Sequence, residues 1–118
     1  MADYVVPVPK SRWADWIAEG DLPGQEAEYE SHFWLPGLPP DVRIGDRLYI
    51  VAHDKLRGYA PVTRWESRCE LNPSRACLIR EGGAAAVTIP EPIRGFQGWR
   101  RRWWPREAEV PFPDWRQP

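Results

Sequence analysis

Apolar and polar positions alternate in short runs along most of the chain, and prolines and glycines separate these runs. Alternation with a period of two over about four to eight residues is typical of half-buried β-strands. A continuous apolar run of similar length is typical of a strand buried on both faces, and 48–52 is the clearest example. The pattern predicts strands at 4–9, 29–35, 48–52, 56–65, 76–80, 85–89 and 96–104.

One segment near the N-terminus has helical rather than strand periodicity. Trp13, Trp16 and Ile17 have the spacing i, i+3, i+4, which places them on one face of a helix. Ser11 is predicted as the N-cap of this helix, and Gly20 as the residue that ends it. A polar loop at 21–28 then connects the helix to the second strand.

Turn residues indicate how the strands pair. The polar connection 53–55 predicts an antiparallel hairpin between 48–52 and 56–65, although Pro61 interrupts the second of these strands. The turn 81–84, with its two glycines, predicts another hairpin between 76–80 and 85–89. The C-terminal tail, about 105–118, is too rich in proline for a regular element, and Phe112 and Trp115 are expected to hold it against the body.

The fold class predicted from these elements is α+β and mainly β, a small β-barrel with one or two short helices. A chain of 118 residues is long enough for one core, so we expect a single domain at 1–118. No run resembles a secretion signal or a membrane-spanning segment, so we expect a cytoplasmic protein without membrane contact.

Charge is distributed unevenly, although the net charge is only −1. Residues 94–118 carry six arginines against three acids, whereas the remainder of the chain has an excess of acids. The protein is therefore no polycation, and strong unselective attraction to nucleic acid is excluded. Cys69 and Cys77 have neither the spacing of a disulfide framework nor that of a zinc pair, and reduced thiols are favoured over a disulfide between neighbouring strands.

Residues 94–106 combine five arginines and three tryptophans with no acidic residue. Guanidinium groups bind phosphate and stack on flat rings, and indoles offer stacking faces, so the segment suits RNA, DNA or a modified nucleotide. As a strand it would carry Arg100, Arg102 and Trp104 on one face and Trp99, Arg101 and Trp103 on the other. Either the tryptophans are core residues beside solvated or ion-paired arginines, or at least two of the arginines contact a ligand.

Two later segments carry a family resemblance. Residues 44–51 supply a Gly-Asp turn and an apolar strand, and 56–62 supply a returning strand with Gly58, Ala60 and Val62 at alternate positions. This arrangement resembles the PUA-like superfamily, which includes the PUA, ASCH and EVE domains. Of the ASCH signature between first strand and helix, only Lys10 is matched. The resemblance implies a barrel with a cleft for RNA or a modified base more than it implies catalysis.

The expected function is a nucleic-acid or modified-nucleotide binding module with an Arg/Trp-lined cleft. The alternatives are a small hydrolase, an amidohydrolase or nuclease using Lys10 and Ser11, and a protein-interaction domain with exposed tryptophans. No catalytic residue or cofactor is predicted. No metal site is predicted either, because His32 has no closely spaced partner among His53, Asp54 and Cys69. The candidate nucleic-acid-binding residues are Lys10, Ser11, Arg12, Arg57, Trp99, Arg100, Arg101, Arg102 and Trp103.

Overall fold

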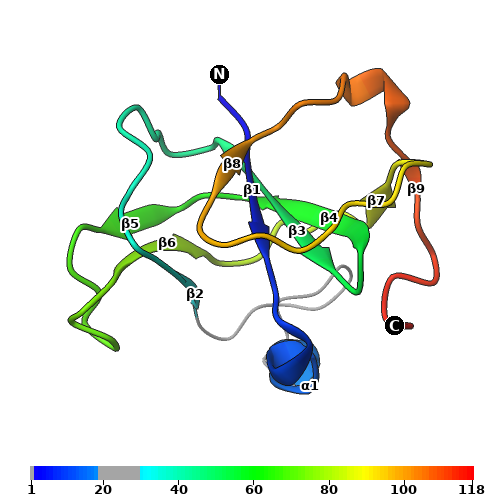
Figure 1. Cartoon of the computed structure of the whole chain (residues 1–118). Helices are drawn as coiled ribbons and strands as arrows, with labels where there is room; N and C mark the ends of the chain where they lie inside the picture. The colour runs from blue at the N-terminus through cyan, green and yellow to red at the C-terminus, as the bar shows by residue number, and fades with distance from the viewer. Residues whose placement is uncertain (1, 19–29) are drawn as a thin grey trace.

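The computed structural model describes residues 2–18 and 30–118 (Figure 1). Its largest sheet has four strands in the order β4-β3-β1-β8, with β1 parallel to β3 and the other pairs antiparallel. The four strands are β1 (Tyr4–Pro7), β3 (Arg47–Ala52), β4 (Lys55–Pro61) and β8 (Arg100–Arg101). The strand predicted at 48–52 is therefore confirmed, and the strand predicted at 4–9 is present but ends at Pro7.

β3 and β4 form the hairpin predicted around the polar connection 53–55. His53 and Asp54 occupy its turn with φ values of 48° and 59°. Two successive residues with positive φ give a two-residue turn whose twist matches that of the paired strands. The tight turn places the two strands side by side over most of their length, which fixes one side of the four-stranded sheet.

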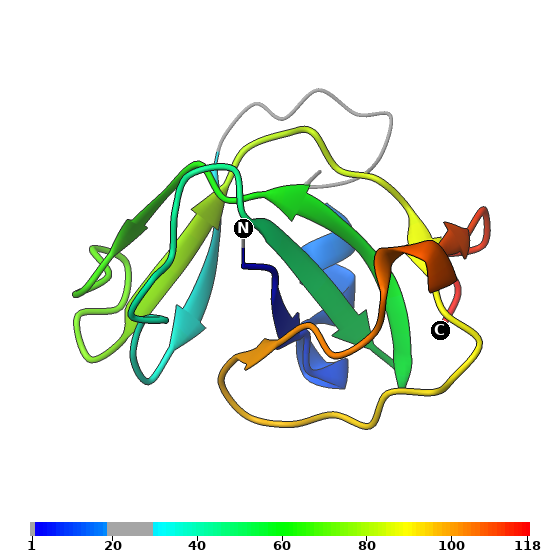
Figure 2. The same cartoon turned by 90° about the horizontal axis from the view of Figure 1, so that it is seen from above.

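A second sheet has three strands in the order β2-β6-β5, with both pairs antiparallel. These strands are β2 (Ser31–Leu35), β5 (Arg64–Glu66) and β6 (Ala76–Arg80). Figure 2 shows this sheet on one side of the molecule and the pair of short strands β7 (Val87–Thr88) and β9 (Val110–Pro111) on the other. Of the strand predicted at 29–35, Tyr29 lies outside the described residues, Glu30 precedes the strand, and 31–35 corresponds to β2.

The single strand predicted at 56–65 is wrong, because the chain passes from one sheet to the other within it. Val62 donates its N–H to the carbonyl of Asp46, next to the start of β3, at 2.8 Å. One residue later, Thr63 donates its N–H to Ile79 of β6 at 2.9 Å. Pro61 lacks an N–H group and so cannot donate to a sheet, which makes it a natural end for β4.

The second predicted hairpin, 76–80 with 85–89, is also wrong. β6 belongs to the three-stranded sheet, whereas β7 (Val87–Thr88) pairs with β9 (Val110–Pro111). Gly82 and Gly83 both have φ of 72°, and Ala85 then pairs with Tyr59 of β4. The glycine segment thus redirects the chain to another strand instead of folding it back on β6.

The early helix begins differently from the prediction. A 3-10 turn, η1 (Lys10–Arg12), leads into α1 (Trp13–Ala18), and Pro9 rather than Ser11 is the residue that precedes the first turn. No side chain caps that turn, so the prediction of Ser11 as N-cap is wrong. Gly20 and the loop 21–28 lie outside the described residues.

The final strand predicted at 96–104 is reduced to the two residues of β8. Gly98 has φ of 73°, which turns the backbone just before β8. After β8, Arg102 still donates its N–H to the carbonyl of Asp3, but the chain then leaves the sheet and enters the 3-10 turn η2 (Arg106–Ala108). Alternation of aromatic and charged residues was therefore a poor guide to the length of this strand.

The core lies between the two larger sheets and continues beyond β1 and β3. Side chains alternate between two clusters along β1 and β3. The main cluster contains Tyr4, Val6, Leu48 and Ile50. The second contains the neighbouring Val5, Tyr49 and Val51, together with Leu56, Ile89, Ile93 and Trp104. Both central strands are therefore buried on both faces, which accounts for their continuous apolar runs.

The C-terminal tail is held against the body as predicted. Trp115 is buried and meets Trp16 of α1 edge to face, with ring centroids 5.8 Å apart. Phe112 is half-buried against the same core cluster. The fold is thus mainly β with one short α-helix, and no sheet among the described residues closes on itself. None of the described helices has the length and apolar character needed to cross a membrane.

Gly58 is expected to be essential for the approach of β4 to residues 85–86. Its φ is 144°, and a Cβ atom there would lie 2.3 Å from the carbonyl oxygen of Ala85. Gly58→Ala should therefore lower the free energy of unfolding by more than about 2 kcal/mol, as measured by urea denaturation. Gly37→Ala is the control, because a Cβ atom at Gly37 has open space around it. Equal stability of the two variants would contradict this assignment.

Candidate functional site

A cavity of about 470 Å³ lies between the end of β1, the η1–α1 segment and β2. Its lining comes from 6–9, from Arg12 and Trp16, from 32–36, and from Arg75 and 96–98. β2 is an outer strand of its sheet, and β1 is covered by β8 only at Tyr4 and Val5. The cavity therefore occupies the seam between the two sheets, opposite the corner where β4 passes into β5.

The groups at this seam suit a flat, anionic ligand. Trp34 is 44% exposed, and the guanidinium carbon of Arg12 lies 5.4 Å from the centroid of its ring. Arg12 is itself half exposed and makes only a loose ion pair with Asp15, at 3.9 Å. A guanidinium beside an indole offers both a stacking face and a phosphate donor. Phe33, Phe96 and Gln97 add aromatic surface and an amide to the same cavity.

A second cavity of about 340 Å³ adjoins the first and contains Lys10. Both cavities are lined by 7–9 and by Phe96 and Gln97, so they lie next to each other, and the two are together called the groove. Lys10 is exposed and makes no ion pair with a carboxylate in the described part of the chain. Ser11 is exposed but lines neither cavity. Of the three predicted residues of η1, Lys10 and Arg12 therefore lie on the groove.

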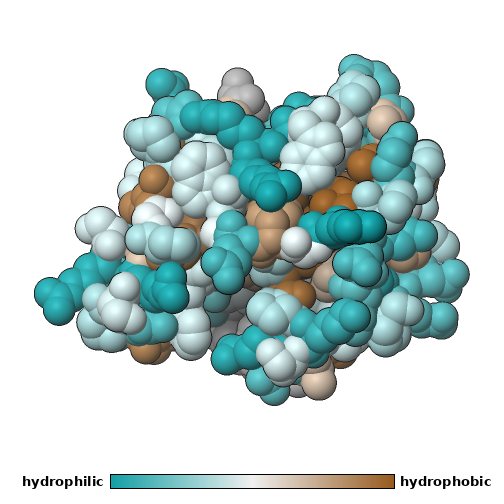
Figure 3. All heavy atoms as spheres, in the orientation of Figure 1, coloured by the Kyte–Doolittle hydropathy of each residue, from teal (hydrophilic) through white to brown (hydrophobic). Residues whose placement is uncertain are grey.

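The arginines of the Arg/Trp segment point to different partners. Arg100 stacks on Phe96, with its guanidinium carbon 4.4 Å from the ring centroid, and so adjoins the groove. Arg101 instead bonds Asp41 at 2.7 Å, and this ion pair holds the pKa of Asp41 below its usual range. Arg102 bonds the buried carboxylate of Asp3 at 3.0 Å. Figure 3 shows that hydrophilic side chains cover most of the face seen in Figure 1, with apolar patches between them.

Asp3 is the centre of an ion cluster that includes two arginines. Its side chain is 1% exposed, and it accepts hydrogen bonds from Arg102 and Arg106 and from the N–H of Arg47. Burial alone would raise the pKa of Asp3, but the hydrogen bonds from Arg106 and Arg102 outweigh it and hold the pKa below its ordinary value. These two arginines are therefore part of the scaffold rather than groups free to bind phosphate.

The tryptophans of the segment divide in the same way. Trp99 is half-buried and meets Tyr4 edge to face, with centroids 5.6 Å apart. Trp104 is buried, and its indole N–H donates to Glu109 at 2.9 Å. Trp103 remains 53% exposed. Trp99 and Trp104 are thus core residues, and only Trp103 presents a large free face, outside the two cavities.

The side chain of Arg57 is buried and binds backbone groups. Its guanidinium donates to the carbonyls of Ala52, Trp115 and Gln117. Burial lowers the pKa of Arg57, and the side chain also stacks against the rings of Trp13 and Phe112. This residue fixes the C-terminal tail to the β3–β4 hairpin, and it lines neither part of the groove.

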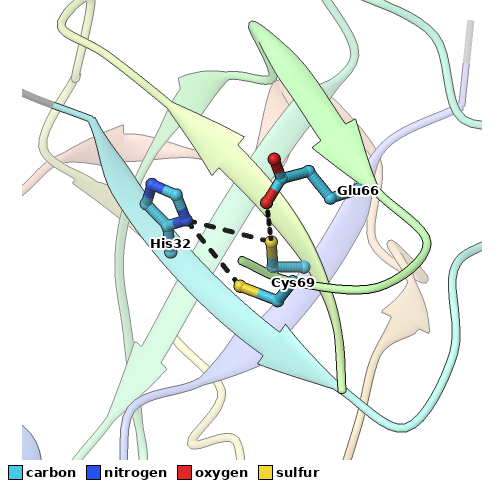
Figure 4. A group of neighbouring side chains, drawn as sticks. His32, Glu66 and Cys69 are labelled. Atoms are coloured by element: carbon cyan, nitrogen blue, oxygen red, sulfur yellow. Dashed lines mark hydrogen bonds between the residues drawn. The ribbon is translucent and has the colours of Figure 1, made fainter. Parts of the chain in front are cut away.

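The second sheet brings together four potential metal ligands, for which the sequence predicted no site. Ligand atoms of His32, Glu66, Cys69 and Cys77 all lie within 4.8 Å of one another. Figure 4 shows His32, Glu66 and Cys69 converging on one point beside β2 and β6. Both cysteines are free and buried. Burial raises the pKa of the Cys77 thiol, and the neighbouring Cys69 and Glu66 raise it further.

Sequence reasoning missed the groove residues Trp34, Arg75, Phe96 and Gln97. Trp34 alternates with Phe33 and Leu35 along β2, and a tryptophan on the face opposite the core residues is a signal for an exposed aromatic side chain. Arg75 and Gln97 give no comparable signal, because each belongs to a loop that only tertiary folding brings to β2.

Comparison with protein-family models, with curated proteins and with solved structures finds no match to this chain.

Asp3→Asn should destabilise the fold at neutral pH, because the amide leaves Arg102 and Arg106 without a counter-charge. We expect a loss of at least about 2 kcal/mol in the free energy of unfolding. The folded-state pKa of Asp3 lies below the ordinary 3.8, so its contribution is present above that pH and is lost as the pH falls through the lower value. Urea denaturation over a pH series measures both effects.

The difference between Asp3→Asn and wild type should therefore shrink as the pH falls below 3.8. Asp114→Asn is the control, because Asp114 is exposed and forms no ion pair with a described residue. A difference that stays constant throughout the acid range would show that the charge of Asp3 contributes nothing.

Proposed function

We propose that this chain is a PUA-like module that binds a nucleotide, free or within a single-stranded segment of RNA or DNA, in the groove between β1 and β2. The pairing of Arg12 with the exposed ring of Trp34 inside the larger cavity is the observation that carries the proposal. A base stacks on Trp34, and its phosphate meets the guanidinium of Arg12. This proposal moves the binding surface from the Arg/Trp segment itself to the groove next to it.

The size and lining of the groove support a ligand of this kind. About 470 Å³ falls within the range of small-molecule sites, which are typically mostly apolar with a few polar groups that fix orientation. Trp34 and Phe96 supply the apolar faces, and Gln97 supplies an amide that can read the edge of a base. The ring of Trp34 belongs to a strand, so it is held more rigidly than a side chain on a loop.

The cations around the groove support binding of a phosphate. Arg75 and Arg100 are exposed, and neither makes an ion pair with a carboxylate in the described segments. Lys10 lies on the adjoining cavity. By contrast, Arg101 and Arg102 are already neutralised by Asp41 and Asp3. The available charge is therefore local, which agrees with a net charge of only −1 and with selective rather than general attraction to nucleic acid.

The order and geometry of the central strands support the PUA-like assignment. Gly45 has φ of 91° in the turn before β3, and Gly58 permits the close approach of residues 85–86 to β4. The chain then bends from β4 into β5 and so links the two larger sheets on one side. A barrel opened at the seam between β1 and β2 accounts for both the arrangement of the sheets and the position of the groove.

The hydrolase alternative receives no support from the surroundings of Lys10. A catalytic lysine needs a partner that takes or supplies a proton, and such partners are held within hydrogen-bond distance. Lys10 is exposed and forms no ion pair or side-chain hydrogen bond with the described residues. Binding is therefore the function that the groove favours.

Trp34→Ala and Arg12→Ala should each weaken binding of short single-stranded oligonucleotides by about tenfold or more. The expected loss corresponds to one stacking contact or one charge-assisted contact. Titration in low salt, followed by tryptophan fluorescence or by anisotropy of a labelled oligonucleotide, measures the dissociation constants. Mononucleotides and modified nucleosides tested in the same way distinguish a free nucleotide from a chain.

Trp103→Ala and Arg101→Ala are matched controls, since Trp103 is exposed outside the groove and Arg101 is paired with Asp41. Both should bind nearly as well as wild type. If these two changes abolish binding and the two groove changes do not, the Arg/Trp segment itself is the binding surface. No saturable binding of any of these ligands by the wild-type protein would overturn the proposed function.

The salt dependence of binding should be shallow. For single strands, the logarithm of the binding constant falls with the logarithm of salt concentration by about 0.7 for each phosphate neutralised. Contacts from Arg12, Arg75 and Arg100 would give a slope of about −2, and Arg75→Ala should reduce its magnitude by about 0.7. A much steeper slope would indicate a binding surface larger than the groove.

A further inference from the structure

The four side chains beside the second sheet come from separate elements that the sheet register brings together. Glu66 of β5 lies opposite Cys77 of β6, and His32 of β2 lies opposite Ile79, two residues from Cys77. Residues directly opposite or diagonal on adjacent strands share one face of a sheet. Cys69 follows β5 and is brought over this face by the loop 67–75. The arrangement is therefore a product of strand pairing and does not depend on the conformation of one loop alone.

The distances among these atoms are close to those of a tetrahedral metal centre. Nδ1 of His32 lies 3.9 Å from the Sγ atoms of both cysteines, and Oε1 of Glu66 lies 3.6 Å from Sγ of Cys77 (Figure 4). Zinc bonds of about 2.3 Å to sulfur and about 2.1 Å to nitrogen or oxygen place tetrahedral ligands about 3.6 Å apart. All four ligand atoms lie within 4.8 Å of one another, so binding an ion requires the longest of these separations to close by up to about 1 Å.

Charged groups lie behind two of the ligands. Nε2 of His32 lies 3.9 Å from Oε1 of Glu30, which is longer than a hydrogen bond, and Nδ1 is the ring nitrogen that faces the sulfurs. Arg64 bonds Oε2 of Glu66 at 2.9 Å, and the other oxygen of Glu66 is the one that faces Cys77. A carboxylate behind a ligating histidine, and a hydrogen bond to a ligating carboxylate, are common features of metal sites.

The burial and charge of the cluster also fit a bound cation. Both cysteines are fully buried, and only Ile79 joins them in their apolar cluster. Two thiolates and Glu66 would carry three negative charges, of which a divalent ion would neutralise two, and Arg64 is shared between Glu66 and Glu30. Thiolate and imidazole ligands favour zinc over the harder magnesium and calcium ions. With four protein ligands the coordination sphere is complete, as in zinc sites that stabilise structure.

We propose that His32, Glu66, Cys69 and Cys77 bind one Zn²⁺ ion that fastens the loop 67–75 to β2 and β6. The site is separate from the nucleotide groove, although His32 contributes to the lining of both. Cys69 is the sole buried residue of this loop; its backbone bonds Arg75 and Asn72 within the loop, and its side chain reaches the sheet through the contact to His32 at 3.9 Å. A bound ion would tie Cys69 of the loop to three strands, through His32 of β2, Glu66 of β5 and Cys77 of β6.

Cobalt titration of the full chain tests the site directly. The protein is treated with a chelator under reducing conditions, and Co²⁺ is then added. One Co²⁺ ion per chain should give intense near-ultraviolet charge transfer from thiolate to cobalt and the strong visible bands of tetrahedral cobalt. Stoichiometric Zn²⁺ should remove both signals. Saturating Co²⁺ that produces no thiolate charge transfer would overturn the proposal.

Single substitutions identify the ligands. Cys77→Ser should lose much of the charge-transfer intensity, and Glu66→Gln should weaken Zn²⁺ binding by about tenfold or more, as measured by competition with a chromophoric chelator. Glu70→Gln is the matched control, because Glu70 is an exposed carboxylate four residues away whose side chain is outside the cluster. If Cys77→Ser fails to fold, the wild-type titration still decides the question. Unchanged Zn²⁺ affinity in a folded Cys77→Ser variant would rule out this site.

Discussion

The buried carboxylate of Asp3 is the interaction on which much of the molecule depends. Asp3 directly precedes β1, and its carboxylate accepts hydrogen bonds from Arg102 and Arg106, which lie about a hundred positions later in the chain. It also accepts the N–H of Arg47 at the start of β3. A buried charge is costly unless it is paired and hydrogen-bonded, so these partners are required together. The cluster sets the position of β8 and of the segment that follows it, and with them the edge of the groove at Phe96.

The groove is a consequence of where the sheets are joined and where they are not. β4 and β5 connect the two larger sheets at a corner, whereas β1 and β2 have no backbone pairing on the opposite side. Side chains from α1 and from 96–98 partly fill this seam and leave room for a small ligand. The same logic explains why Arg12 and Trp34, which are distant in sequence, lie together: each belongs to an element on one side of the seam.

β2 connects the groove with the cysteine cluster. His32 and Trp34 alternate with core residues along this strand, and each has a separate set of partners: His32 meets Cys69 and Cys77, and Trp34 meets Arg12. An ion that fixed the imidazole would also stiffen the strand that presents the indole. The proposed zinc site and the proposed nucleotide site are therefore distinct, but they share the side chain of His32 and one short strand.

Residues whose role follows from local pattern were predictable from the sequence. The apolar run of β3, the turn at His53 and Asp54, and the anchoring by Phe112 and Trp115 depend on hydrophobicity and turn chemistry that short segments carry by themselves. Arg12 and Lys10 were candidates because they lie next to the predicted start of the helix, and Lys10 also because of the family resemblance; both line the groove. The wrong predictions at 56–65 and 76–89 concern which strand pairs with which, the one at 96–104 concerns the length of a strand, and the Ser11 N-cap concerns where the helical segment begins.

By itself, the sequence determined that this protein is mainly β, that its strands are short, and that arginine and tryptophan gather near the C-terminus. Tertiary structure decided which of those arginines are available, because only the fold brings Asp3 and Asp41 against Arg102 and Arg101. It also assembled His32, Glu66, Cys69 and Cys77, whose spacing along the chain carries no metal-binding motif. Long-range pairing of this kind depends on sheet register, and a linear pattern of hydrophobic and polar residues does not specify which strands will be neighbours.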